Sequence, residues 1–367
     1  MSKLSPDSIQ QDQMWMQFAL AEAETAIYRT RPNPAVGCVI VKDHQIVGRG
    51  ATAPVGGSHA EVFALKQAGD QAQGATAYVT LEPCAHYGRT PPCANGLVEA
   101  GITRVVIACS DPNPLVAGKG VQILKNAGIE VLQGVCEAQA AAQNRGFLKA
   151  IATGMPYVRL KVASSLDGRT AMASGESKWI TGTEARQDVQ HWRAISGVVI
   201  TGIETVLADD CQLNVRQLDG IADISSIVQP KRLVLDRQGR LPLNAKILNV
   251  PETVMVMGPF RQELADLGVL QFSVQPLTDL LQRLATQHHI YDVLVEAGAT
   301  LSTAFLQARL VDEMISYVAP TFLGQTARAM FNAEFSRMAE QLRFKLMEVT
   351  QLGNDVRLRL IPSQETV

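Results

Sequence analysis

The sequence predicts two α/β domains in one chain. At 367 residues the chain is longer than a single hydrophobic core usually supports. Apolar strand-like runs alternate with helical stretches through both halves, which is typical of α/β domains. Met155-Pro156 separates the two series. We therefore expect a first domain over residues 1–150 and a second over residues 156–367.

The composition is that of an ordinary folded protein. Hydrophobic residues make up 47% of the chain and charged residues 19%, which argues against disorder. A formal net charge of -2 gives no global reason to expect nucleic-acid binding. We find neither a signal-peptide pattern behind Lys3 nor an apolar run near the ~20 residues of a bilayer span. The sequence therefore predicts a cytoplasmic protein with neither a nucleic-acid nor a membrane partner.

The first domain is expected to be a three-layer α/β/α structure. Its first helix should bury Trp15, Phe18, Ala19 and Ala26, and the prolines after Arg31 should end it. The first two strands should pair as a hairpin. Strands are expected at 36–41, 46–51, 76–81, 105–108 and 130–134, and helices at 11–28, 59–68, from Pro92 onward, 121–126 and 137–150.

The second domain repeats the alternation with a different ending. Its last two strands should form an antiparallel hairpin around Gly353-Asn354. The segment from Thr201 to Arg216 is expected to be one polar connection. Strands are expected at 157–163, 197–200, 232–235, 253–257, 292–295, 344–349 and 356–361, and helices at 184–194 and 301–310.

One imidazole, two thiols and one carboxylate are placed at the starts of two predicted helices in the first half. Ser58 is a plausible N-cap for a helix that carries His59 and Glu61 in its first turn. Pro83-Cys84 follows a strand, and Cys93 opens the next helix. A catalytic zinc ion takes three such ligands and leaves one position for water. His59, Cys84 and Cys93 are the candidate ligands, and Glu61 is the candidate proton shuttle.

Two other interpretations of these residues remain open. A structural zinc site would bring four protein ligands, and His86 could be the fourth. The arrangement could also be coincidental, since a lone His-x-Glu or Pro-Cys has little meaning. Cys38 and Cys109 stand in apolar strand-like runs, and we interpret both as small buried side chains.

The segment from Pro83 to Cys93, with Gly-Arg-Thr-Pro-Pro between the cysteines, resembles the deaminase half of the RibD family of bifunctional riboflavin-biosynthesis enzymes. The stretch from Arg31 to Gly37 is similar to the family's substrate loop, which makes Asn33 a candidate substrate contact. The resemblance implies a cytidine-deaminase-like fold and hydrolytic deamination of a pyrimidinone at C2, with Glu61 moving the proton. One departure is Phe63, where many relatives carry a second histidine.

Two features of the second half suggest a further site. Lys161 is a charged residue on an apolar strand, and it is either a snorkelling lysine or a site residue. The strand ending at Glu296 runs into Gly298 and a helix whose free N–H groups suit a phosphate. This is not the Gly-x-Gly-x-x-Gly fingerprint, so the pattern alone leaves nucleotide binding open.

The second half resembles the RibD reductase domain, which implies a dihydrofolate-reductase-like fold and NADPH as cofactor. The resemblance makes Lys161 the candidate that polarises or protonates the ribose ring oxygen, and the arginines candidates for its 5′-phosphate. Departures are Cys211 in place of a usual proline, Arg237 in place of Ser or Thr, and an insertion at 217–229. The implied NADPH-site residues are Ala163, Trp179, Thr205, Asp209, Gly298, Ala299, Thr300, Leu301, Ser302, Thr303 and Ala304, and the implied substrate-site residues are Ser177, Arg193, Leu213, Arg216 and Glu296.

Three other functions are alternatives to this one. The first is a single-activity zinc deaminase whose second domain only scaffolds. The second is a tRNA-type deaminase, against which the near-neutral charge counts. The third is a zinc-stabilised binding module, which leaves Glu61 unexplained. The expected partner is a small pyrimidine ribose phosphate, and the resemblance implies a homodimer or homotetramer.

Overall fold

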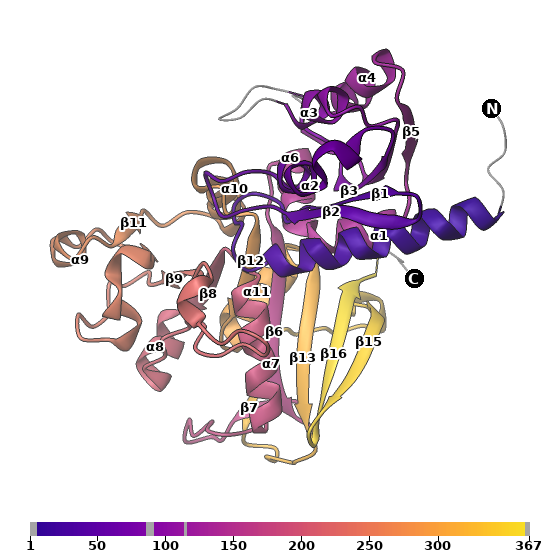
Figure 1. Cartoon of the computed structure of the whole chain (residues 1–367). Helices are drawn as coiled ribbons and strands as arrows, with labels where there is room; N and C mark the ends of the chain where they lie inside the picture. The colour runs from indigo at the N-terminus through magenta and orange to yellow at the C-terminus, as the bar shows by residue number, and fades with distance from the viewer. Residues whose placement is uncertain (1–5, 86–91, 114–115, 364–367) are drawn as a thin grey trace. The chain divides into compact units, whose positions relative to one another are not determined.

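The computed structural model describes residues 6–85, 92–113 and 116–363. The chain forms two compact units, Met1–Gly154 and Met155–Val367, each with its own sheet (Figure 1). In the part of the chain that is described, no helix combines the length and apolar character needed to cross a membrane.

The first unit is built on a five-stranded sheet in the order β2-β1-β3-β4-β5. The β1–β2 and β1–β3 pairs are antiparallel, and the β3–β4 and β4–β5 pairs are parallel. The strands are β1 Gly37–Lys42, β2 Gln45–Ala51, β3 Thr76–Leu81, β4 Arg104–Cys109 and β5 Glu130–Gln133. The helices are α1 Pro6–Ala26, α2 Ala60–Ala68, η1 Gly69–Ala72, α3 Cys93–Glu99, α4 Lys119–Asn126, α5 Glu137–Gln143 and α6 Arg145–Thr153.

Helices cover both faces of this sheet. A Cβ added to Gly37 would lie 1.9 Å from the Ala19 carbonyl oxygen of α1. A Cβ added to Gly50 would lie 2.4 Å from the Ala60 carbonyl oxygen of α2. Gly50 pairs with Cys38, the neighbour of Gly37, and successive strand residues point to opposite faces, so the two helices lie on opposite sides. The predicted three-layer architecture is confirmed.

The second unit is built on a nine-stranded sheet in the order β11-β10-β9-β8-β12-β6-β13-β16-β15. The first seven strands in this order, from β11 to β13, run parallel to one another. At the edge of the sheet, β16 and β15 form the predicted antiparallel hairpin. β7 and β14 form a separate pair. The strands are β6 Tyr157–Ser165, β7 Arg169–Ala171, β8 Val198–Gly202, β9 Lys231–Leu235, β10 Val254–Met257, β11 Leu270–Phe272, β12 Asp292–Glu296, β13 Glu313–Ala319, β14 Arg328–Ala329, β15 Phe344–Leu352 and β16 Asp355–Pro362.

Alternate residues of the central strands supply two cores, one on each face. Leu160 and Val295 belong to the core that contains Phe305, whereas Leu294 and Tyr317 belong to the core that contains Trp192. The helices are α7 Thr183–Ala194, α8 Ile203–Asp209, η2 Ile224–Ser226, η3 Lys246–Asn249, η4 Pro251–Thr253, α9 Gln262–Asp266, α10 Leu277–His288, α11 Ala299–Gln307 and η5 Met338–Glu340.

Four local predictions are corrected. Phe18 is 44% exposed and does not join the core. The predicted helix 137–150 is two helices, because Asn144 leaves helical geometry and its side chain binds the backbone of Ala35. The N-cap of α2 is His59, not Ser58, so His59 precedes the first turn. The connection predicted from Thr201 to Arg216 contains helix α8.

Candidate active sites

Three ligand-type side chains of the first unit converge on one point. His59 caps α2, Cys84 follows β3 through Glu82-Pro83, and Cys93 is the first residue of α3. Their ligand atoms all lie within 4.8 Å of one another. The Nδ1 atom of His59 is 3.1 Å from the Sγ of Cys93 and 3.7 Å from the Sγ of Cys84. The predicted ligand set is thus brought together by two helix starts and the end of strand β3.

The electrostatics of this cluster favour a thiolate. A hydrogen bond from the Cys93 thiol, supported by His59, lowers the pKa of Cys84 to about 4. The backbone N–H of Cys93 also donates to the Cys84 sulfur at 3.3 Å. A thiolate beside an imidazole is a donor pair that zinc prefers. Among the described residues the group has three members, which suits a site with an open position; the alternative fourth ligand, His86, lies outside the described residues.

Glu61 lies beside the three ligands, in the first turn of α2. Glu61 is only 4% exposed, and this burial raises the pKa of its carboxyl group. The charge of His59 and a hydrogen bond with Cys93 act in the opposite direction. A buried carboxyl group with a raised pKa at such a place suits proton transfer.

Asn33, the predicted substrate contact, stands in the exposed turn between α1 and β1. Its backbone N–H donates to the Thr30 carbonyl oxygen at 2.9 Å. The contacts recorded for the described residues do not connect its side chain with the three ligand residues.

In the second unit, Lys161 and Glu296 face each other across neighbouring parallel strands. They are direct partners in the β6–β12 register, and Lys161 Nζ lies 3.9 Å from Glu296 Oε2. Burial lowers the pKa of Lys161. Burial alone would raise the pKa of Glu296, but the charge and hydrogen bonds of Arg193 lower it. The pair is therefore a buried lysine next to an ionised carboxylate.

Arg193 on α7 holds this carboxylate in place. Its Nε and Nη2 atoms donate to the two oxygens of Glu296 at 2.6 and 2.9 Å, and Nη1 donates to the Asn214 carbonyl oxygen at 3.2 Å. This corrects the expectation that the fork of Arg193 serves a phosphate. Arg216 is exposed, and its charge also lowers the pKa of Glu296.

Of the predicted site residues, Ser177 contacts Asp209 at the end of α8. Ser177 Oγ donates to its carboxylate at 3.5 Å, and the Lys178 ammonium lies 3.8 Å from it. Trp179 is 69% exposed and stacks under the Arg186 guanidinium at 4.5 Å. Thr205 lies on the same helix α8.

The turn around Gly298 is, as predicted, a strand followed by a helix start. β12 ends at Glu296, Gly298 caps α11, and no side chain caps its N-terminal N–H groups. Thr300 and Thr303 accept hydrogen bonds from Asn332, and Ser302 donates to the Ala297 carbonyl oxygen. These three hydroxyl groups therefore brace the turn. Leu301 and Ala304 lie on the same helix.

One residue of this region, Tyr317, escaped the sequence reasoning. The Tyr317 ring lies 6.0 Å from Lys161 Nζ, on strand β13, and only the sheet topology reveals that this strand pairs with β6.

Leu213 was predicted to line the substrate, but its side chain is buried in the core with Trp192. The partly buried Cys211 interacts electrostatically with Glu296, and burial raises the pKa of its thiol to about 11. Ala163 on β6 packs against the same core.

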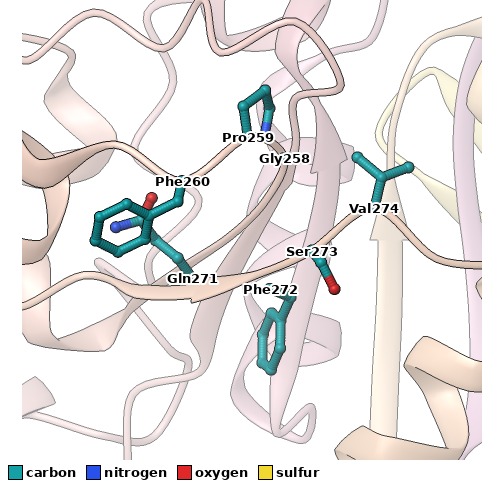
Figure 2. A pocket seen from close by; sticks show the side chains of 7 residues that line it. All are labelled: Gly258, Pro259, Phe260, Gln271, Phe272, Ser273 and Val274. Carbon is teal, nitrogen blue, oxygen red and sulfur yellow. The ribbon is translucent and has the colours of Figure 1, made fainter.

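A separate hollow lies where β10 and β11 end (Figure 2). It has a volume of about 330 Å³ and a mainly apolar lining that includes Pro259, Phe260 and Val274. The Phe260 residue is 70% exposed. The sequence did not single out this hollow.

Comparison with known proteins first defines the class of each half. Residues 9–109 match the model of the cytidine and deoxycytidylate deaminase zinc-binding region. Residues 156–358 match the RibD C-terminal domain. A zinc-binding deaminase domain thus precedes a reductase-type domain in one chain.

Full-length relatives then define the family. The chain is 46% identical to riboflavin biosynthesis protein RibD of Haemophilus influenzae, over 96% of this chain and 98% of the relative. It is 45% identical to RibD of Escherichia coli, over 96% and 99%. A solved structure of Acinetobacter baumannii RibD matches with a TM-score of 0.95 at 73% sequence identity. The match covers 97% of this chain and 100% of that chain. The chain belongs to the RibD family.

A more distant solved structure shares the whole architecture. A diaminohydroxyphosphoribosylaminopyrimidine deaminase/5-amino-6-(5-phosphoribosylamino)uracil reductase from Thermotoga maritima matches with a TM-score of 0.88 at 32% identity. It covers 97% of this chain and 100% of its own. The predicted fold class, a deaminase-like domain followed by a reductase domain, is confirmed.

Proposed function

We propose that the two sites of this chain catalyse successive steps, with the residue roles set out below. The enzyme is a bifunctional deaminase and reductase of riboflavin biosynthesis, and its cofactors are zinc and NADPH. The first step is hydrolytic deamination at C2 of 2,5-diamino-6-ribosylamino-4(3H)-pyrimidinone 5′-phosphate. The second is reduction of the ribosyl group to ribityl, which gives 5-amino-6-(5-phosphoribitylamino)uracil.

In the first step, His59, Cys84 and Cys93 would hold the zinc ion, and the 4.8 Å cluster of their ligand atoms carries this proposal. Bound zinc supplies a water molecule with a lowered pKa at neutral pH. Glu61 would accept one proton from that water and deliver it to the ring nitrogen, and it would then carry the second proton, from the hydroxyl group added at C2, to the departing ammonia. Asn33 would contact the substrate as the family's substrate loop does.

In the second step, Lys161 would polarise or protonate the ribose ring oxygen while hydride reaches C1′. Glu296 would keep Lys161 in position next to the substrate. Its carboxylate is itself held in place, because it pairs with Arg193 as well as with Lys161. The backbone at the start of α11, from Gly298 to Leu301, would bind the cofactor's phosphates. Arg216 would bind the substrate phosphate, with Ser177 nearby, and Ala163, Trp179, Thr205 and Asp209 would complete the NADPH site.

We also propose a cytoplasmic location and a small-molecule partner without nucleic acid. The six cysteines are free thiols, which suits a reducing compartment. A homodimer or homotetramer is proposed from the family resemblance. The domain boundaries at 150 and 156 are proposed as the limits of the two catalytic halves.

The experiment that tests the first site is zinc analysis of the purified chain, combined with ammonia release from the diaminopyrimidinone substrate. We expect bound zinc in the wild-type protein and its loss in His59→Ala. Retention of zinc and full deamination by that variant would contradict the assigned ligand set.

A further inference from the structure

We propose that Glu82 is a positioning residue that fixes the zinc ligand Cys84 by tying its turn to the start of α4. This inference rests on the proposed zinc site. Glu82 stands between β3 and Cys84, and it has no place in the proposed proton transfers.

Glu82 is a buried carboxylate bonded to backbone rather than to a cation. The residue is only 4% exposed. Its Oε2 atom accepts the backbone N–H of Gly118 at 3.2 Å, and Oε1 accepts that of Val121 at 3.3 Å. Gly118 is the N-cap of α4, and its own side chain offers no cap. Glu82 therefore satisfies two N–H groups that the helix start would otherwise leave without an intrahelical partner.

The backbone on either side of the Glu82 side chain is held as well. The Glu82 N–H donates to the Cys109 carbonyl oxygen at 2.9 Å, which extends the contact between β3 and β4. A Cβ added to Gly120 of α4 would lie 2.0 Å from the Pro83 carbonyl oxygen. Helix α4 thus rests directly on the peptide that leads into Cys84.

Beyond this point the turn is tied to the second thiol ligand. The Cys84 carbonyl oxygen accepts the Ala94 N–H at 3.3 Å, and its Sγ accepts the Cys93 N–H at 3.3 Å. Glu82 therefore anchors the turn on the side of β3, and α3 anchors it on the other side. Without the Glu82 carboxylate, the end of the turn next to β3 would be less firmly held. The distance between the Cys84 and Cys93 sulfur atoms would then vary more.

The test is zinc release from the full-length protein into a chromophoric chelator, with the spectrum of the cobalt-substituted protein as a second readout. Partners that orient metal ligands typically contribute about 10–100-fold to metal affinity. We expect Glu82→Ala to weaken zinc binding by about that factor and to alter the cobalt–thiolate absorption. Glu82→Gln, which keeps one acceptor oxygen, should fall between Glu82→Ala and the wild type.

Leu124→Ala separates positioning from a general weakening of the helix. Leu124 is fully buried in α4 and belongs to the hydrophobic core, and its truncation destabilises the same element while the carboxylate of Glu82 stays in place. We expect this variant to keep near-wild-type zinc affinity in its folded state. NADPH oxidation with the deaminated substrate should be unchanged in all three variants, because it reports on the second unit.

Wild-type zinc affinity in Glu82→Ala, or equal zinc loss in Leu124→Ala, would overturn the proposal. Absence of zinc from the wild-type protein would instead overturn the proposed metal site. The two failures are therefore distinguishable in one experiment.

Discussion

The chemistry of Glu61 depends strongly on its surroundings. The side chain lies beside the three ligand residues, and burial raises the pKa of its carboxyl group. We predict that Glu61→Gln keeps zinc and loses deaminase turnover by at least about 100-fold, since a positioned proton carrier contributes that much. Ammonia release and zinc content measure the two effects. Full turnover in this variant would remove Glu61 from the mechanism.

Lys161 has the corresponding place in the second site. It is buried, with a lowered pKa, and lies 3.9 Å from Glu296. We predict that Lys161→Met lowers kcat for the reduction by about 100-fold or more, since it removes the proposed proton donor. The exposed Lys345 offers a matched control, and Lys345→Met should leave both activities unchanged. Unaltered NADPH oxidation by Lys161→Met would show that the lysine is structural.

His191 on α7 should make the second unit sensitive to acid. Burial, together with Arg159, Arg357 and Arg359, lowers the pKa of its imidazole to about 4. The ordinary value is about 6.5, so between pH 6.5 and 4 the unfolded chain binds the extra proton. Stability from this group is complete above that window and is lost as the pH falls, by at most about 1.4 kcal/mol per pH unit.

Unfolding of the wild type and of His191→Gln in denaturant at several pH values measures this contribution. The variant should lose less stability than the wild type between pH 7 and 5. Identical pH profiles would show that folding does not lower the pKa of His191.

At the scale of elements, the approach of α2 to β2 sets the position of the first site. A Cβ at Gly50 would lie 2.4 Å from the Ala60 carbonyl oxygen, next to His59. We predict that Gly50→Ala destabilises the first unit by about 1–3 kcal/mol and lowers deaminase activity, because overpacking shifts the helix. Gly96→Ala is the control, since a Cβ there meets only Leu65 at 3.7 Å. Equal stability of the two variants would contradict this account.

The regular elements and the metal ligands could be predicted because both depend on short stretches of sequence, namely apolar periodicity and the motifs around the ligands. Strand β3 was predicted with its observed bounds, His59 and Cys93 stand at two helix starts, and Cys84 follows the end of β3. The break at Asn144 could not be predicted, because its cause is a hydrogen bond to Ala35, a residue far away in the sequence.

The second site was harder to predict for a similar reason. The bidentate bond between Arg193 and Glu296 joins α7 to β12 across the fold, so the sequence offered no sign that the arginine was already engaged. Tyr317 approaches Lys161 only because β13 is parallel to β6. Such contacts follow from sheet order, which a single sequence does not specify.

At the scale of the whole molecule, each unit has its own sheet and its own core. We therefore predict that chelation of zinc abolishes deamination and leaves NADPH oxidation with the deaminated substrate unchanged. The check is to assay both activities before and after dialysis against a chelator, and again after zinc is restored. Loss of the reductase activity on chelation would show that the units depend on one another.

The most direct test of the account is a coupled assay of the purified full-length chain on the diaminopyrimidinone substrate, with and without NADPH. Without NADPH we predict ammonia release and accumulation of the deaminated ribosylamino compound. With NADPH we predict, in addition, one NADPH oxidised for each ammonia released and formation of the ribitylamino product. Ammonia release with no NADPH oxidation would contradict the two-step account and leave a single-activity deaminase.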